Sequence, residues 1–128
     1  MNKYDIEQAA IHLGIRKSAL EKKEKGVNLE ELGKKDPRLI FRDYGEEQVL
    51  ELKDEKYKDL EDGLIGLGYM DEVFYIADLN EGGSGVIEDP ISPVKSQAYL
   101  LIDEGVVNNL TKIVDLLVEM SDIRLKNL

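Results

Sequence analysis

The segment EVFYIADL (Glu72–Leu79) decides the predicted fold, because its β-branched and aromatic residues favour a strand. It leads into NEGGS (Asn80–Ser84), which is rich in turn-forming residues, and then into GVIE (Gly85–Glu88), which can return beside it. Two short strands joined by a glycine-rich turn are typical of a β-hairpin. We therefore expect a hairpin near residues 73–88.

Further strands are predicted on both sides of this hairpin. Leu39–Tyr44 alternates charged with bulky residues, and QAYLLID (Gln97–Asp103) is a short apolar run that we also predict to be a strand. Glu46–Leu60 fits either one charged helix or a strand through Val49–Leu52 followed by a short helix. Gly63–Gly68 is interpreted as a turn, because it lacks the lysine and hydroxyl residue of a phosphate-binding loop.

Two helices are predicted near the N-terminus. Asp5 can cap a first helix that ends at Gly14. Ser18 and Glu21 have the spacing of a capping box, which opens a short basic helix over Ala19–Lys25.

Two more helical segments follow the same logic. Asn28 and Glu31 predict one further helical turn before a break at Pro37, and Asn109 is the predicted cap of a final helix. One apolar face of that final helix carries Leu110, Ile113, Val114, Leu117 and Met120. N-terminal helices, a small antiparallel sheet and a C-terminal covering helix together predict one α+β domain spanning residues 1–128.

The composition excludes several kinds of chemistry. The chain has 128 residues, no cysteine and a single histidine, so thiol catalysis, thiolate metal sites and disulfides are ruled out. The longest plain apolar run, Ala98–Ile102, is far too short to span a membrane, and we expect a cytoplasmic protein. His12 has no second histidine with which to bind a metal.

The segment Asp78–Asp89 partly matches a calcium-binding loop. Gly82 replaces an oxygen ligand and Asp89 replaces the bidentate glutamate of such loops, so a hairpin turn is the better interpretation. We predict no metal, no cofactor and no catalytic residue, and therefore no enzyme.

Acidic residues outnumber basic ones 27 to 17, for a formal net charge of −10. Most of the excess lies between Asp36 and Asp89, and a field of this sign repels nucleic acid and attracts basic proteins. Solubility alone remains an equally open explanation. The candidate residues for binding a basic partner are Glu46, Glu47, Asp54, Glu55, Tyr57, Asp78 and Glu81, and the candidate aromatic anchors are Tyr44, Tyr57, Tyr69 and Tyr75.

Four segments together resemble the SUKH superfamily, whose bacterial members are largely immunity proteins against toxins. They are IEQAAIHLG (Ile6–Gly14), FYIADLNEGGSGVIEDP (Phe74–Pro90), AYLLIDEG (Ala98–Gly105) and LTKIVDLLVEM (Leu110–Met120). The resemblance implies an immunity protein against a toxin. Together with the acid excess, it predicts a non-catalytic protein that docks on and neutralises a basic partner such as a nuclease toxin. A small phage or mobile-element protein that inhibits a host enzyme would use the same mechanism on a different target.

A second resemblance implies a different function. IEQAAIHLGIRKSAL (Ile6–Leu20) is similar to the helix-turn-helix of MerR-type regulators, and Phe41–Leu52 is similar to the segment that follows it there. The alternative is therefore a DNA-binding regulator that uses a helix-turn-helix within residues 5–26. Its predicted phosphate contacts are Arg16, Lys17, Lys22 and Lys23.

Overall fold

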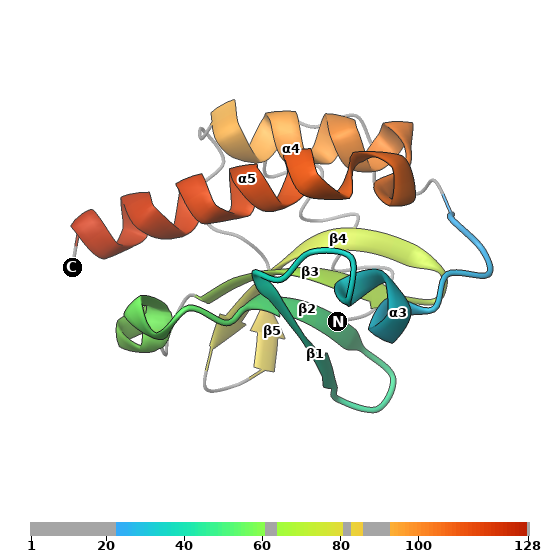
Figure 1. Cartoon of the computed structure of the whole chain (residues 1–128), viewed down its shortest axis with the longest axis horizontal. Coiled ribbons are helices and arrows are strands. Elements are labelled where there is room, and N and C mark those ends of the chain that lie inside the picture. The colour runs from blue at the N-terminus through green and yellow to red at the C-terminus, as the bar shows by residue number, and fades with distance from the viewer. Residues whose placement is uncertain (1–22, 61–63, 81–82, 86–92, 128) are drawn as a thin grey trace.

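A computed structural model of the chain describes residues 23–60, 64–80, 83–85 and 93–127 (Figure 1). The predicted helix that ends at Gly14, His12, and most of the predicted helix Ala19–Lys25 lie outside these residues. In the described part, a five-stranded antiparallel sheet has helices packed on one face. The α+β class is thereby confirmed.

The elements follow one another in a simple order. They are α3 (Leu29–Gly33), β1 (Leu39–Asp43), β2 (Gln48–Leu52), the 3-10 helix η1 (Glu55–Leu60), β3 (Leu64–Met70), β4 (Val73–Asn80), β5 (Gly83–Gly85), α4 (Pro93–Glu104) and α5 (Val106–Lys126). Neighbouring strands in the sheet are also neighbours in sequence, in the order β1-β2-β3-β4-β5. Such a meander needs only short connections between antiparallel strands.

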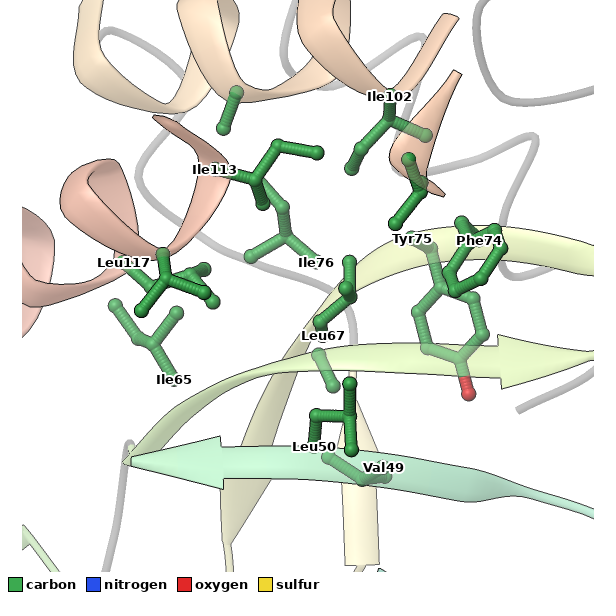
Figure 2. Packing of buried hydrophobic residues seen from close by; sticks show 14 of the residues in the cluster. Val49, Leu50, Ile65, Leu67, Phe74, Tyr75, Ile76, Ile102, Ile113 and Leu117 are labelled. Carbon is green, nitrogen blue, oxygen red and sulfur yellow. The ribbon is translucent and has the colours of Figure 1, made fainter. Parts of the chain in front are cut away.

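The core lies between the sheet and the two long helices. Figure 2 shows Leu50, Leu67 and Ile76 of the strands pointing towards Ile113 and Leu117 of α5, and all five side chains are buried. Leu50, Leu67 and Ile76 are aligned because Leu50 pairs with Leu67 and Leu67 with Ile76. The predicted apolar face of the last helix is confirmed, since all five of its residues are buried.

The hairpin around EVFYIADL is also confirmed, with a shifted partner. β4 pairs with Gly83–Gly85, which lies earlier than the predicted return strand Gly85–Glu88. The strand predicted over Leu39–Tyr44 is confirmed as β1, which ends at Asp43. Of the two possibilities for Glu46–Leu60, the strand followed by a short helix is the one formed.

Two predicted elements are wrong. The segment Gln97–Asp103, predicted to be a strand, is part of helix α4. The buried residues of α4 have helical spacing: Lys95, Ala98, Tyr99 and Ile102. Pro93 opens that helix at a position where its missing N–H costs nothing.

Gly63–Gly68, predicted to be a turn, instead contributes the inner strand β3 from Leu64 onwards. Its glycines serve close packing: a Cβ on Gly66 would lie 2.8 Å from the Val49 side chain and 2.9 Å from the carbonyl oxygen of Leu50. A Cβ on Gly68 would collide with the Tyr75 ring. The glycines thus leave room for side chains from the neighbouring strands to cross β3.

The start of α5 also differs from the prediction. The helix begins at Val106 after Gly105, whose φ of 124° is readily adopted only by glycine. Asn109 lies inside the helix and donates its side-chain N–H to the carbonyl of Gly105, at 2.9 Å. The free amides of the first turn, Val106 and Val107, instead donate to the carboxylate of Glu24, at 2.8 and 3.4 Å.

The described part of the segment that carries Glu24 is not helical. Lys23 forms an antiparallel bridge with Val73, and Gly26 has a φ of 72°. The predicted helix over Ala19–Lys25 is wrong for its last residues, because the backbone there runs alongside the start of β4. By contrast, the turn predicted from Asn28 and Glu31 is confirmed: the Asn28 side chain accepts the Glu31 N–H at 3.1 Å and caps α3.

Candidate functional site

The tight connection between β1 and β2 exposes two of the predicted candidates, Tyr44 and Glu46. Tyr44 donates its N–H to the carbonyl of Glu47 at 2.9 Å, and Gly45 has a φ of 90°. The Asp43 carboxylate accepts the Gly45 N–H at 2.9 Å. These bonds fix a compact turn on which Tyr44 and Glu46 are exposed.

The Tyr44 side chain is held in a defined position although 56% of it is exposed. Its hydroxyl donates to Oε1 of Glu51 at 2.6 Å, and Nε of Arg42 lies 3.5 Å from Oε2 of the same carboxylate. Partial burial and the hydrogen bond to Glu51 raise the pKa of Tyr44 to about 12. The phenol is therefore protonated at neutral pH, and its hydroxyl can donate to the Glu51 carboxylate.

A second tyrosine–carboxylate pair lies at the same end of the sheet. The Tyr75 hydroxyl donates to the Glu47 carboxylate, and both side chains are buried. In Figure 2 the Tyr75 ring crosses β3 with its hydroxyl directed away from the helices, which is the crossing that Gly68 permits. We call Arg42, Tyr44, Glu46, Glu47, Glu51 and Tyr75 the turn cluster.

Two other predicted acidic residues, Asp54 and Glu55, lie at the opposite end of β2. Oδ1 of Asp54 accepts the Lys56 N–H at 3.0 Å and so caps η1, while Glu55 is exposed and pairs with Lys58 at 3.3 Å. The structure therefore separates Asp54 and Glu55 from Glu46 and Glu47 by the length of a strand.

Tyr57 is buried beside these residues and links η1 to α5. Its hydroxyl donates to Asp122 at 2.8 Å, and Lys56 lies 3.3 Å from the same carboxylate. A cleft of about 530 Å³ opens next to it, bounded by Arg38, Lys53 and Val118 among others.

Arg38 ties the start of β1 to α5 at this same end of the molecule. It lies 2.7 Å from the buried Asp36 and 2.6 Å from Asp115. The hydrogen bond from Arg38 lowers the pKa of Asp36. We call Asp36, Arg38, Lys56, Tyr57, Asp115 and Asp122 the anchor cluster.

The four candidate tyrosines thus have different surroundings. Tyr57 and Tyr75 are buried among core residues of this chain, and Glu47 is buried likewise. Tyr69 is half-buried, packs on Phe74 with ring centroids 4.5 Å apart and donates to the carbonyl of Glu24. Tyr44 is the candidate whose ring is exposed.

The remaining predicted residues receive little structural description. Asp78 belongs to β4 and pairs through its backbone with Gly85, while Glu81 lies outside the described residues, as do Arg16, Lys17 and Lys22. Lys23 is exposed and lies in a β-bridge. DNA binding by residues 5–26 remains a prediction.

Arg42 and Glu51 were not among the candidates predicted from the sequence. They share a face because the β1–β2 register places Ile40 opposite Glu51 and Arg42 opposite Val49. The alternation along Leu39–Tyr44 gave a signal for Arg42. The position of Glu51 depends on the register of β2 against β1. The sequence could not give this register, because it left open whether Glu46–Leu60 forms a helix or a strand.

Neither metal binding nor membrane insertion has support in the described part of the chain. Within residues 23–60, 64–80, 83–85 and 93–127, no three Asp, Glu, His or Cys side chains come together as metal ligands. None of the helices described there combines the length and apolar character that crossing a bilayer requires. Comparisons with protein-family models, with curated proteins and with solved structures find no match to this chain.

Proposed function

We propose that this protein is a non-catalytic binding protein, an immunity or inhibitor protein that docks on a basic partner such as a nuclease toxin through the β1–β2 turn. The observation that carries the proposal is the exposed Tyr44 ring, held in place by its 2.6 Å hydrogen bond to Glu51. Tyrosines of this kind are enriched among residues that dominate protein–protein binding. A ring already fixed in position loses little further freedom on binding.

The charges around Tyr44 support the same proposal. Asp43 and Glu46 are exposed on either side of it, and Glu51 lies beneath its hydroxyl. Carboxylates at the rim of an interface steer a basic partner and raise the rate of association more than the final affinity. Tyr44 would thus supply contact area, while Asp43 and Glu46 speed the approach.

The proposal is tested by affinity capture of the tagged full-length chain from native lysate, with and without nuclease treatment. We expect one basic protein in both samples, and its binding to the purified chain can then be measured. Tyr44→Ala is expected to weaken that binding by about tenfold to a hundredfold, which is the loss typical of an interface anchor. Recovery of DNA, or of proteins that disappear after nuclease treatment, would instead support the helix-turn-helix alternative.

A charge-reversed pair of variants locates the docking surface. Glu46→Lys and Glu55→Lys each change an exposed glutamate, at opposite ends of β2, and neither residue belongs to the core. We expect Glu46→Lys to slow association and flatten its salt dependence, whereas Glu55→Lys has a smaller effect. Equal effects, or no effect of Tyr44→Ala, would show that the partner docks elsewhere.

A further inference from the structure

Within the part of the chain that the structure describes, the outer side of β1 is an open sheet edge. β1 is terminal in the strand order, and its hydrogen bonds to β2 can be assigned from two flanking bonds: Lys53 N–H to the Arg38 carbonyl and Tyr44 N–H to the Glu47 carbonyl. In an antiparallel pair, hydrogen-bonded positions alternate along each strand. Ile40 and Arg42 therefore face β2, and the backbone groups of Leu39, Phe41 and Asp43 point outward.

These outward groups have no partner in the part of the chain that the structure describes, with one exception. The Leu39 N–H donates to the Asp36 carbonyl at 3.2 Å. The N–H and C=O of Phe41 and of Asp43 remain available to a further strand. Exposed edges of this kind pair readily with another extended chain.

A groove runs beside this edge, between β1 and α3. Two clefts of about 440 and 470 Å³ lie along it, and both are bounded by Phe41 of β1 and Glu30 of α3. α3 packs close to the sheet here: a Cβ added to Gly33 would lie only 2.7 Å from the Leu50 side chain, so the absence of a side chain at Gly33 allows the close approach. The groove therefore has a helix as one wall and a strand with free backbone groups as the other.

The charge at one end of the groove favours a basic occupant. Among the described residues that line the cleft nearer the β1–β2 turn are two carboxylates, Glu30 and Asp43, and no basic side chain. Further along, the second cleft is also lined by Lys34, which is held by Glu31 at 3.1 Å, and by Lys53, while the buried Asp36 is held by Arg38. The acidic end of the groove is therefore the end beside Asp43. A positively charged side chain entering beside Asp43 would meet carboxylates on both walls.

We propose that the β1 edge binds an extended basic segment of the partner as a sixth, antiparallel strand, whose cationic side chains lie between Glu30 and Asp43. This inference rests on the proposed function, because it describes how the same partner is held. Strand addition of this kind draws affinity from backbone hydrogen bonds and specificity from alternate side chains. The antiparallel direction continues the pattern of the whole sheet and is the more stable pairing.

The geometry makes a sharp prediction about the bound segment. Phe41 and Asp43 have side chains on the groove side, since Phe41 pairs with Leu50 and Asp43 with Gln48. In an antiparallel hydrogen-bonded pair, directly opposite residues share a face. The segment's groove-facing residues are therefore also those whose N–H groups pair with β1.

A synthetic peptide tests this geometry on the intact chain. The probe is an acetylated and amidated peptide of alternating lysine and valine that begins and ends with lysine, added to the ¹⁵N-labelled full-length protein at low salt. We expect the Phe41 and Asp43 amides to shift and to become protected from hydrogen exchange. Methylating the backbone nitrogens of the lysines should abolish binding, whereas methylating those of the valines should preserve it.

Charge variants of the protein provide a matched control. Glu30→Gln combined with Asp43→Asn is expected to weaken peptide binding by roughly fivefold to tenfold at low salt, because two exposed ion pairs are lost where salt screens them little. The asparagine introduced by Asp43→Asn keeps a side-chain oxygen that can accept the Gly45 N–H. Glu55→Gln, at the far end of β2, should leave peptide binding unchanged.

Several outcomes would overturn the strand-addition inference. These are equal binding by the two methylated peptides, peptide binding that leaves the Phe41 and Asp43 amides unshifted, and concentration-dependent protection of those amides without peptide, which would make a second copy of this chain the occupant. Any of these, together with captured-partner binding that still depends on Tyr44 and Glu46, would leave the proposed function standing. Peptide pairing at β1 combined with partner binding that ignores Tyr44 and Glu46 would overturn the proposed docking surface instead.

Discussion

A tyrosine hydroxyl donates to a carboxylate at each end of β2, but the two tyrosines have different roles. At the anchor cluster, the Tyr57 hydroxyl donates to Asp122 at 2.8 Å, and the ring is 4% exposed. At the turn cluster, the Tyr44 hydroxyl donates to Glu51 at 2.6 Å, and the ring is 56% exposed. The hydrogen bonds are alike, and the environments of the rings are opposite.

The difference shows that burial of the ring, rather than the hydrogen bond, determines what each tyrosine contributes. Tyr57 joins η1 to α5, two elements far apart in sequence, and so stabilises the tertiary structure. The bond of Tyr44 closes within one hairpin and leaves apolar area in contact with water. Exposed apolar area of this kind contributes favourably only when a partner covers it and removes it from water.

The largest expected effect comes from deleting each ring. Tyr57→Ala should lower the free energy of unfolding by about 3–5 kcal/mol, because it removes a buried aromatic ring and leaves a cavity. Tyr44→Ala should lower it by about 1 kcal/mol or less, since most of its ring is already in water. Urea unfolding of both variants measures the difference, and similar losses would contradict the comparison.

The arginines at the two ends should differ by a smaller amount. Arg38→Ala leaves the buried Asp36 without its cation and should cost about 2 kcal/mol, less than a fully buried pair because Arg38 is itself 38% exposed. Arg42→Ala removes an exposed contact 3.5 Å from Glu51 and should cost about 0.5 kcal/mol or less.

The loss in Arg38→Ala should also depend on pH. Arg38 lowers the pKa of Asp36, so this pair stabilises the fold above the usual aspartate pKa, and the stabilisation is lost as pH falls through the lowered folded-state value. The unfolding free energies of the wild type and Arg38→Ala should therefore converge in strong acid. A difference that stays constant down to low pH would show that Arg38 acts through packing alone.

Removing only the hydroxyl groups tests the hydrogen bonds themselves. Tyr57→Phe should cost about 1 kcal/mol, because Asp122 keeps its contact with Lys56 but loses a partly buried hydrogen bond. Tyr44→Phe should cost about 0.5 kcal/mol or less, since water can replace the lost donor. It should nevertheless weaken partner binding, because the ring is no longer held in place. Wild-type affinity in Tyr44→Phe would show that the bond to Glu51 does not orient the ring.

The last prediction concerns the ionisation of Tyr44, which changes the free energy of unfolding only at high pH. Its pKa of about 12 in the folded chain exceeds the ordinary value of 10.0, so the bound proton stabilises the folded state below pH 10. That stabilisation is lost as pH rises from about 10 to about 12, where only the unfolded chain gives up the proton. NMR of ¹³C-tyrosine-labelled protein should show a late titration that moves towards pH 10 in Glu51→Gln. An unchanged midpoint in that variant would mean that burial alone raises the pKa.

Segments whose local pattern agrees with their environment could be predicted from the sequence. EVFYIADL is a strand in isolation and in the fold, and the apolar face of α5 has helical spacing over its whole length. Asn28 caps α3 through a bond within its own turn. In each case the deciding interactions lie within a few residues along the chain.

Segments with conflicting patterns were predicted wrongly. QAYLLID is short and apolar, which suits a strand or a buried helix equally, and Pro93 at the first helical position was the missed signal. Gly63–Gly68 carries turn-forming residues, yet LIGLGYM also alternates with a period of two. Gly66 and Gly68 leave space for the side chains of Val49 and Tyr75, which come from neighbouring strands.

The sequence by itself determined the α+β class, the central hairpin, the apolar face of α5 and the excess of acidic residues between Asp36 and Asp89, because local periodicity and charge specify these features. Only the tertiary structure decided that Tyr44 is exposed while Tyr57 and Tyr75 are buried, and that Glu24 caps α5 across more than 80 residues. Strand register and helix packing set these distances, and both depend on contacts between segments far apart in the chain. The candidate site is therefore defined by which face of the sheet each side chain occupies.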